Sequence, residues 1–331
     1  MSETRIEPTP LTPSDQFPAA VNPTMYFIGV TTHKSSIMNV FPRWANHWGL
    51  EDARIRGINF KQHDAPDNYR RAVDFIKHDP LSLGALVTTH KLDLLSACRN
   101  QFDQLDEFAL LMHEVSSLSK RDGQLIGHAK DPITSGLAIE ALLPANYWKN
   151  SGAEALILGA GGSAIALSWY LLSPDRGANR PTRIVVTNRS KKRLEEIQAL
   201  HQSIEADLPL EYHLTPTPES TDSIMRDMNP GALVVNATGL GKDAPGSPLT
   251  NSAIWPQDGI AWDFNYRGNL KFLDQARAQQ QERNLSIADG WVYFLQGWTR
   301  VIAEVFGIDI PTSGPAFDKL SEIASNCRIT N

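Results

Sequence analysis

A glycine-rich turn between an apolar strand pattern and an apolar helix pattern constrains this chain more than any other feature. Residues 155–158 form a short apolar run, residues 159–164 read Gly-Ala-Gly-Gly-Ser-Ala, and residues 165–172 continue with an apolar helical pattern. This order is typical of the first unit of a dinucleotide-binding fold. Gly159 would permit the tight turn, Gly161 would let the backbone approach a pyrophosphate, and Ala164 would let the helix pack on the strand. A glycine turn without a ligand is the alternative.

The residues after this turn predict that the same unit continues. Further buried-strand patterns occur at 183–188, 231–238 and 260–264, and Ser190 is a good N-cap for a helix over residues 191–201. Between the first two strands, residues 173–182 contain prolines and a glycine and indicate a loop. Because strands and helices alternate, we predict a parallel, doubly wound sheet.

The end of the second strand of this unit indicates which dinucleotide would bind. An acidic residue there would hydrogen-bond the ribose hydroxyl of NAD. This chain instead has Asn188, Arg189, Ser190 and Lys191, followed by two more basic residues. A guanidinium can hold a phosphate through two parallel hydrogen bonds, so the sequence favours NADP. A solvated basic helix start is the alternative.

The N-terminal part of the chain predicts a second α/β region. Strand patterns occur at 25–30, 54–60 and 84–89, and the last of these leads into His90 and Lys91. Helical patterns precede residue 50 and cover residues 66–78. The Asp122-Gly123 pair predicts a hairpin turn between 117–119 and 125–127. A helix is expected to open at Asp131, and another covers residues 291–306.

Composition excludes several classes of protein. A chain of 331 residues suggests two domains, and a net charge of -6 without a long basic run argues against a nucleic-acid partner. No apolar stretch reaches the length of a membrane span. The proline-rich start lacks the features of a signal peptide, so we expect a cytoplasmic protein. The two cysteines and nine histidines show no metal-ligand spacing, and no metal is expected.

The fold that we predict is α/β, with an N-terminal α/β substrate domain and a Rossmann-type, doubly wound NADP domain. A flexible extension would cover residues 1–24. The N-terminal domain would span residues 25–134. The NADP-binding domain would span residues 135–289.

From Tyr26 onward, a series of motifs resembles the shikimate/quinate dehydrogenase family. Residues 85–91 resemble its Asn-Val-Thr-x-Pro-x-Lys segment, and residues 115–118 and 128–131 resemble its Val-Asn-Thr and Asn-Thr-Asp segments. Residues 159–164 and 188–190 are similar to its NADP turn and its Asn-Arg-Thr motif. Residues 236–238, 263–266 and 289–297 resemble its Asn-Ala-Thr, Asp-x-x-Tyr and final Gly…Gln segments.

This resemblance implies a role for each matching residue. Lys91 would be the catalytic acid/base and Asp131 its carboxylate partner. The substrate-binding residues would be Ser35, Ser36, Ser116, Tyr266 and Gln296. The NADP-binding residues would be Gly159, Ala160, Gly161, Gly162, Ser163, Ala164, Asn188, Arg189, Ser190, Lys191, Ala237, Thr238 and Gly290.

The chain departs from the family where the family binds its substrate. The family holds a carboxylate with a Ser-x-Ser-Pro loop, whereas residues 33–37 here read His-Lys-Ser-Ser-Ile. One alignment leaves Ile37 in place of the second serine, and the other leaves Lys34 in place of the first. His33 and Lys34 could replace the lost hydroxyl, or form a solvated loop. Val87 replaces a threonine and Ser116 an asparagine, and Ala129-Lys130 replaces Asn-Thr beside Asp131.

The resemblance implies that the domain over residues 25–134 is substrate-binding and catalytic and is completed by C-terminal helices at 290–331. It also implies an NADP-dependent oxidoreductase of the shikimate dehydrogenase type. It would transfer a hydride reversibly between the nicotinamide and a hydroxyl or keto carbon of a small, polyhydroxylated, cyclic acid such as shikimate or 3-dehydroshikimate, or a relative. Two alternatives remain open: an enzyme like methylene-tetrahydrofolate dehydrogenase, and a non-catalytic NADP-binding regulatory protein. The sequence also leaves open whether the chain forms a homodimer.

Overall fold

The chain folds into two compact units. The computed structural model describes residues 9–14, 16–204, 207–242 and 244–329. Unit 1 contains the chain up to residue 130 together with residues 297–329, and unit 2 contains residues 131–296. The chain therefore passes from one unit to the other after Lys130 and again inside helix α12 (Trp291–Phe306). The sequence placed these boundaries at 134/135 and 289/290.

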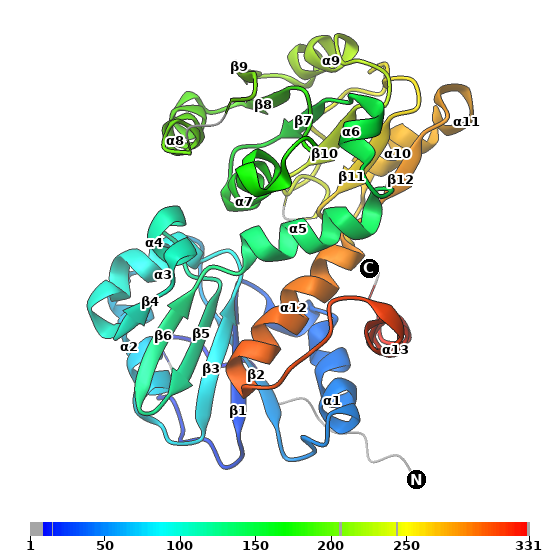
Figure 1. The fold of residues 1–331 in the computed structure, drawn as a ribbon. Helices are drawn as coiled ribbons and strands as arrows, with labels where there is room; N and C mark the ends of the chain where they lie inside the picture. The colour runs from blue at the N-terminus through cyan, green and yellow to red at the C-terminus, as the bar shows by residue number, and fades with distance from the viewer. Residues whose placement is uncertain (1–8, 15, 205–206, 243, 330–331) are drawn as a thin grey trace. The chain divides into compact units, whose positions relative to one another are not determined.

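Unit 1 is built on a six-stranded mixed sheet in the order β2-β1-β3-β5-β6-β4 (Figure 1). The first three strands are parallel, β5 and β6 form an antiparallel hairpin beside β3, and β4 pairs with β6 in parallel. The strands are β1 (Thr24–Gly29), β2 (Arg54–Asn59), β3 (Ser82–Val87), β4 (Gln104–Leu105), β5 (Ser117–Arg121) and β6 (Gln124–His128).

Alternate residues of β1 explain how helices cover both faces of this sheet. Tyr26 and Ile28 join a buried cluster with apolar residues of α2 and α3, while the ring of Phe27 lies 5.0 Å from that of Trp298 in α12. Every buried side chain of this size contributes about 1.5–3 kcal/mol to folding. The helices that lie within unit 1 are α1 (Ile37–His47), α2 (Pro66–His78), α3 (Lys91–Cys98), α4 (Glu107–Met112) and α13 (Gly314–Ser325).

The predicted hairpin is confirmed. Asp122 and Gly123 both have positive φ, at 51° and 77°, and they join β5 to β6. Two consecutive residues with positive φ are the requirement of a type I′ turn, whose twist matches that of the flanking strands. The short strands Ser117–Arg121 and Gln124–His128 therefore pair in register without a longer loop.

Part of the predicted N-terminal extension packs on unit 1. Leu11 is buried, and it forms an isolated parallel bridge with Ile58 at the edge of β2. The ring of Phe17 stacks on that of Phe75 at 5.2 Å. Residues 1–8 and 15 lie outside the described residues.

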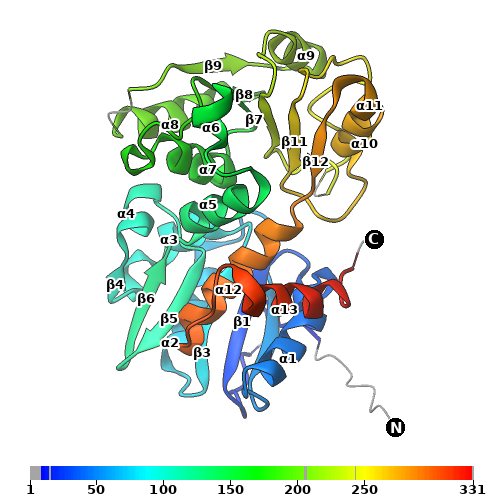
Figure 2. The same ribbon diagram turned by 45° about the vertical axis from the view of Figure 1, so that its right-hand side comes forward.

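Unit 2 confirms the predicted doubly wound fold. Its six strands are all parallel, in the order β9-β8-β7-β10-β11-β12 (Figure 2). This is the strand order 3-2-1-4-5-6 of dinucleotide-binding folds, and the order reverses between β7 and β10. The strands are β7 (Ala155–Leu158), β8 (Ile184–Asn188), β9 (Leu210–Leu214), β10 (Leu233–Asn236), β11 (Ile260–Asp263) and β12 (Ser286–Ala288).

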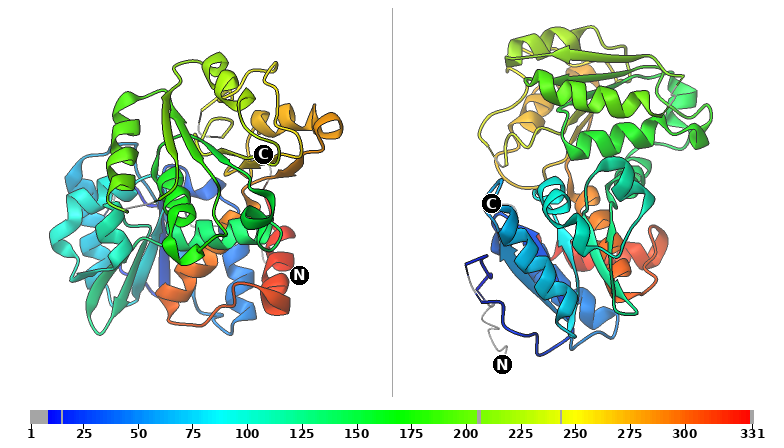
Figure 3. Two further views of the ribbon diagram at one scale, coloured as in Figure 1. Left: turned by 45° about the horizontal axis from the view of Figure 1, so that its top comes forward. Right: turned by 90° about the vertical axis from the view of Figure 1, so that its left-hand side faces the viewer.

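Both faces of the unit 2 sheet are covered, because its central strands are apolar on both sides. Ile157 packs in one cluster with residues of α7 and α8, which Figures 2 and 3 show on the same face. Leu156 and Leu158 pack in another cluster with residues of α9 and α10. The helices of unit 2 are α5 (Asp131–Leu142), α6 (Tyr147–Ser151), α7 (Gly162–Leu172), α8 (Lys191–Gln202), α9 (Pro218–Arg226), α10 (Lys271–Arg277) and α11 (Gln280–Arg283).

Some elements differ from the sequence prediction. Strand β3 ends at Val87, two residues before the predicted end, and Lys91 is the first residue of α3 rather than a strand terminus. Strand β9 was not predicted; it has only five residues, and none of them is fully buried. The predicted loop over 173–182 contains only one helical turn, Pro174–Arg176.

The described part of the chain shows neither a membrane-spanning helix nor a metal-binding cluster. No helix there is long and apolar enough to cross a membrane. No group of three or more His, Cys, Asp or Glu side chains there could hold a metal ion. Cys98 and Cys327 are both buried and form no disulfide.

Candidate nucleotide-binding and catalytic residues

The glycine turn lies where the strand order of unit 2 reverses. Gly159 follows β7 with a φ of 115°, and a Cβ atom there would lie 2.7 Å from the carbonyl oxygen of Ala237, which follows β10. Gly161 is exposed, and a Cβ atom there would meet nothing within 4 Å. Gly159 is therefore required by the fold, whereas Gly161 leaves open space in front of the first N–H groups of α7.

The remaining residues of the predicted turn begin α7. Gly161 is its N-cap, with an extended backbone, and Gly162 and Ser163 form the first turn. Ala160 and Ala164 are fully buried against the sheet. Because the first N–H groups of a helix have no partner within it, this start can bind an anion such as a pyrophosphate.

The predicted adenosine-phosphate motif follows β8. The side-chain oxygen of Asn188 accepts a hydrogen bond from the backbone N–H of Ser190 at 3.0 Å, and Ser190 Oγ caps α8 by accepting from the N–H of Arg193. Arg189 is exposed between them. The ammonium of Lys191 is exposed and lies 3.7 Å from the carboxylate of Glu195. The motif therefore orients its backbone through its own polar residues and leaves basic side chains toward solvent.

A buried hydrogen-bond network holds the loop after β10. Asn236 accepts from both the N–H and the hydroxyl of Thr238, at 3.1 and 2.6 Å, and donates to Asp263 at the end of β11 at 3.1 Å. Asn265 donates to the carbonyl of Leu240 at 3.0 Å. Burial raises the pKa of Asp263 to about 6, against hydrogen bonds from Asn265 and Asn236. The predicted residues Ala237 and Thr238 thus lie on a fixed loop beside Gly159.

Gly290, Tyr266 and Gln296 also lie in unit 2. A Cβ atom on Gly290 would lie 2.0 Å from the carbonyl oxygen of Phe264, so the backbone requires glycine there. The ring of Tyr266 is 4.7 Å from that of Phe294 in α12. Gln296, also on α12, is 1% exposed. Tyr266 therefore packs among aromatic rings, and Gln296 is almost fully buried.

The serine loop of unit 1 follows β1. His33 and Lys34 are exposed in a short 3-10 helix, Thr32–Lys34, whereas Ser35 is buried. Ser36 is fully buried, and its hydroxyl accepts a hydrogen bond from the backbone N–H of Ile329 at 2.9 Å. Ile37, at the position of the family's second serine in one alignment, is fully buried at the start of α1.

The candidate catalytic lysine begins a helix. Lys91 is half-buried and is the first residue of α3, directly after the loop that leaves β3. The N–H of Thr88 in this loop donates to the carbonyl of Ile28 at 3.0 Å, and the carbonyl of Lys91 accepts from the N–H of Val115 at 3.3 Å. The loop before Lys91 is therefore held by β1, and the backbone carbonyl of Lys91 is held by Val115.

Asp131 opens α5 and is 7% exposed, and its carbonyl accepts a hydrogen bond from the hydroxyl of Thr134 at 3.1 Å. It is the first residue of unit 2, whereas Lys91, Ser35, Ser36 and Ser116 belong to unit 1.

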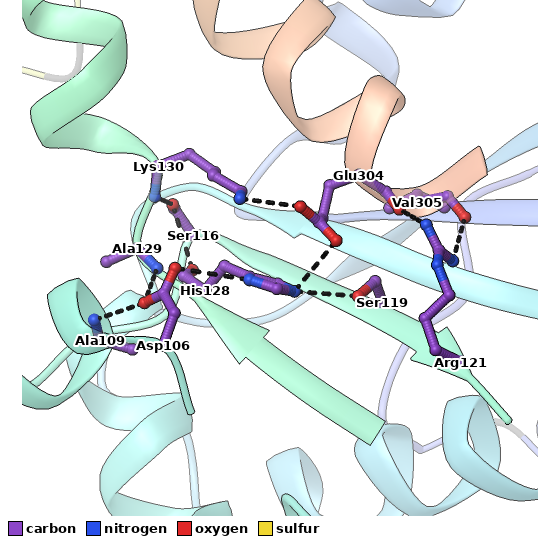
Figure 4. Close-up of polar contacts among 10 residues, drawn as sticks. All are labelled: Asp106, Ala109, Ser116, Ser119, Arg121, His128, Ala129, Lys130, Glu304 and Val305. Atoms are coloured by element: carbon purple, nitrogen blue, oxygen red, sulfur yellow. Dashed lines mark hydrogen bonds and ion pairs between the residues drawn. The ribbon is translucent and has the colours of Figure 1, made fainter. Parts of the chain in front are cut away.

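Unit 1 also contains a cluster of charged residues that the sequence did not predict (Figure 4). Lys130 Nζ lies 2.9 Å from Glu304 Oε2, and His128 lies between Asp106 and Glu304, 3.4 and 3.5 Å from their carboxylates. His128 also hydrogen-bonds Ser119 at 2.9 Å. Glu304 is on α12, far from the others in sequence, so no local pattern could have revealed this cluster.

Comparison with known sequences confirms the resemblance that the motifs predicted. No protein-family model matches the chain. The NADP-specific shikimate dehydrogenase of Lactococcus lactis is 28% identical over 191 residues, which cover 57% of this chain and 63% of that protein. The corresponding protein of Methanothrix thermoacetophila is 32% identical over 173 residues, covering 52% of this chain and 55% of that protein. Each match thus spans less than two thirds of the curated relative.

Solved structures with the same fold cover almost the whole chain. Quinate dehydrogenase of Corynebacterium glutamicum in complex with NAD superposes with a TM-score of 0.70 at 17% identity, over 92% of this chain and 99% of that chain. Shikimate 5-dehydrogenase of Thermus thermophilus, in complex with NADP(H) and shikimate, has a TM-score of 0.66 at 20% identity and the same coverage. The 5-ketofructose reductase of a Gluconobacter strain has a TM-score of 0.63 at 19% identity, covering 92% and 98%.

Proposed function

We propose that this chain is an NADP-dependent oxidoreductase of the shikimate dehydrogenase type. It transfers a hydride reversibly between the nicotinamide and a hydroxyl or keto carbon of a small polyhydroxylated acid. The observation that carries the proposal is the position of Gly159, at the reversal of a 3-2-1-4-5-6 strand order and directly against the loop after β10. Ligands of doubly wound sheets bind at this point.

The residues of unit 2 fit a dinucleotide. The open space at Gly161 and the N-terminus of α7 suit a pyrophosphate, and the loop at Ala237 and Thr238 lies on the other side of the turn. Arg189 and Lys191 offer cations for a ribose phosphate, and the strand β8 ends in Asn188 rather than an acid. These features, and the names of the curated relatives, favour NADP over NAD.

The chemistry assigned to Lys91 and Asp131 is a proton transfer. NADP, when bound, supplies the hydride acceptor, so the proton of the substrate hydroxyl must be taken by the protein. In oxidation the neutral amine of Lys91 accepts this proton, and in reduction its ammonium returns it to the forming hydroxyl. Asp131 holds the amine and the hydroxyl together. This assignment rests on the match of both residues to the family motifs.

The residues that would recognise the substrate differ from those of the family, so the substrate is shikimate, 3-dehydroshikimate or a relative of these acids. Ile37 is fully buried and carries no hydroxyl, and Ser36 gives its oxygen to the backbone of Ile329. Ser35, Tyr266 and Gln296 remain candidates for direct contact with the substrate, and Ser36 and Ser116 are further candidates. A lost hydrogen-bonding group in a polar site costs about 10⁴-fold in discrimination, so a related polyol or keto acid is the expected substrate.

The proposed function is tested by assaying a panel of substrates with NADP and with NAD. Shikimate, quinate and 5-ketofructose, with their redox partners, are incubated with the protein, and the absorbance of reduced nicotinamide is followed. We expect turnover with NADP of at least one of the acids, shikimate or quinate or their keto forms; turnover of 5-ketofructose alone would contradict the proposed class of substrate. Bound NADP with no turnover of any member would instead support the alternative of a non-catalytic NADP-binding protein.

Two substitutions test the acid/base pair. Lys91→Ala and Asp131→Asn should each lower kcat by about 10²–10⁴-fold and leave the Kd of NADP nearly unchanged, because neither residue holds the nucleotide. Lys319→Ala, which removes an exposed lysine paired with Glu322 on α13, is the matched control and should behave as the unmodified protein. Normal turnover in either of the first two variants would remove the proposed mechanism.

A further inference from the structure

We propose that Ser116, Lys130 and Glu304 are positioning residues, which fix the chain as it enters Asp131. This inference rests on the proposed function, because it gives these residues a role through the proposed catalytic carboxylate. Lys130 directly precedes Asp131, and Ser116 and Lys130 are two of the positions at which the chain departs from the family motifs.

Three elements of unit 1 hold residues 129–130. The backbone N–H of Lys130 donates to Ser116 Oγ, just before β5, at 2.7 Å. The N–H of Ala129 donates to the carboxylate of Asp106, the N-cap of α4, at 3.2 Å. The ammonium of Lys130 donates to Glu304 on α12 at 2.9 Å (Figure 4). The two residues before Asp131 are thus anchored through both backbone N–H groups and one side chain.

The Lys130–Glu304 pair is shielded from water more than an ordinary surface pair. The two side chains are 16% and 27% exposed. Burial alone would raise the pKa of the Glu304 carboxyl, but the hydrogen bond from Lys130 and the charges of His128, Lys130 and Arg121 outweigh it and lower this pKa. Glu304 is therefore ionised, and removing it would leave the ammonium of Lys130 buried without its carboxylate.

The backbone of Glu304 is itself fixed. The guanidinium of Arg121, at the end of β5, donates to the carbonyl oxygens of Glu304 and Val305. This pairing ties the last turn of α12 to the hairpin that carries His128. The carboxylate of Glu304 thus faces Lys130 from a rigid helix, and a rigid support is what a positioning residue requires.

Ser119, His128 and Asp106 are arranged in the order of a hydrolase triad. Ser119 is fully buried, so a substrate cannot reach its hydroxyl. The same ring nitrogen of His128, Nε2, faces both Ser119 and the carboxylate of Glu304, which lies 3.5 Å away. The cluster therefore supports the turn at residues 129–130 and offers no nucleophile.

The inference predicts a defect in turnover rather than in binding. Glu304→Ala removes the anchor of Lys130, and a small displacement of a catalytic group costs up to about 10²-fold in rate, so we expect kcat to fall about 10-fold or more. The KM of the substrate and the Kd of NADP should change by less than about twofold. Glu304→Gln still accepts a hydrogen bond from Lys130 and should be intermediate.

A second readout does not depend on activity. Hydrogen exchange of the Lys130 amide, which donates to Ser116, is measured by NMR in the full chain. We expect slow exchange in the unmodified protein and faster exchange in Glu304→Ala and in Ser116→Ala. Glu322→Ala, which removes an exposed carboxylate paired with Lys319, is the matched control and should change neither kcat nor this exchange rate.

The outcomes separate the two proposals. If the unmodified protein turns over no member of the substrate panel, the proposed function fails, and the amide exchange alone decides on the positioning role. Normal kcat together with unchanged amide exchange in Glu304→Ala would overturn the inference. If Glu304→Ala fails to fold by circular dichroism, Glu304→Gln and Ser116→Ala provide the same comparison.

Discussion

At the scale of single residues, Gly159 and Gly161 serve different needs although they stand two positions apart. Any side chain at Gly159 meets the backbone of Ala237, and its φ of 115° is one that other residues rarely adopt. Gly161 has an ordinary φ of -91° and free space around it. The first glycine is needed by the fold, and the second by the ligand that the fold would bind.

We therefore expect two different phenotypes. Gly159→Ala should lower the free energy of unfolding by about 1–3 kcal/mol and abolish NADP binding, because the turn must shift. Gly161→Ala should leave that free energy unchanged or raise it by up to about 1 kcal/mol, because its φ suits alanine. Its affinity for NADP should nevertheless fall, because the methyl group enters the space in front of α7.

Denaturant unfolding and fluorescence titration with NADP measure these two quantities. The related glycine Gly152, which ends α6 at a φ of 63° with nothing within 4 Å, provides the control for backbone strain alone. Gly152→Ala should be destabilised without losing NADP. If Gly161→Ala binds NADP as tightly as the unmodified protein, the proposal that this turn binds the pyrophosphate is wrong.

The sequence predicted single residues well where the backbone itself requires them. Gly159 and the Asp122-Gly123 pair were recognised because positive φ leaves few choices of residue. Glu304 was not, because its contact with Lys130 joins residues 174 positions apart. The hydrogen bonds of Ser36 and Ser116 to backbone groups were also missed. A motif alignment shows which residue is present, but not which group its side chain contacts.

At the scale of elements, His201 joins three parts of unit 2. It lies in α8, and its two ring nitrogens contact the hydroxyls of Ser168 in α7 and Tyr212 in β9, each at 2.7 Å. Burial lowers the pKa of His201 to about 4. The folded protein therefore keeps this imidazole neutral at a pH where an unfolded chain, with an ordinary pKa near 6.5, takes up a proton.

This difference makes the stability of the fold depend on pH. Below about pH 6.5 the unfolded state binds a proton that the folded state does not, so the free energy of unfolding falls as the pH decreases. Between pH 6.5 and the folded pKa, His201 should account for a loss of about 3 kcal/mol. His201→Gln should remove this part of the slope, as measured by denaturant unfolding at a series of pH values. If the free energy of unfolding changes equally with pH in the unmodified protein and in His201→Gln, this role of His201 is wrong.

Long amphipathic elements were predictable and short or polar ones were not. The helices Pro66–His78 and Trp291–Phe306 lie where the sequence placed them, because their apolar residues recur at helical spacing. Strand β3 was predicted too long, since Thr88 and Thr89 favour strands by type but already lie in the loop before Lys91. Strand β12 has only three residues, too few for a pattern.

At the scale of the whole molecule, the pattern of elements was sufficient to predict two α/β units and a doubly wound sheet in the second. The boundary after Lys130 was placed a few residues too late, inside the helix that opens at Asp131, because apolar spacing within a helix does not show where a unit begins. The return of residues 297–329 to unit 1 was expected from the resemblance, since periodicity alone gives no partner for a C-terminal helix.

Nucleotide binding should stabilise the molecule by a calculable amount. A ligand at 100 times its Kd raises the free energy of unfolding by about 2.7 kcal/mol, which corresponds to several degrees in Tm for a domain of this size. We expect NADP to give this shift and NAD at the same concentration a smaller one. Arg189→Ala should reduce the difference between the two cofactors, and an equal shift by both in the unmodified protein would contradict the preference.

The most direct measurement of the central claim follows the hydride itself. A panel hydroxy acid, deuterated at the carbinol carbon, is incubated with the protein and NADP, and the nicotinamide product is analysed by mass spectrometry. The account predicts one deuterium on the reduced nicotinamide, and its loss in Lys91→Ala with NADP still bound. Reduced nicotinamide without deuterium, or undiminished transfer in Lys91→Ala, would contradict it.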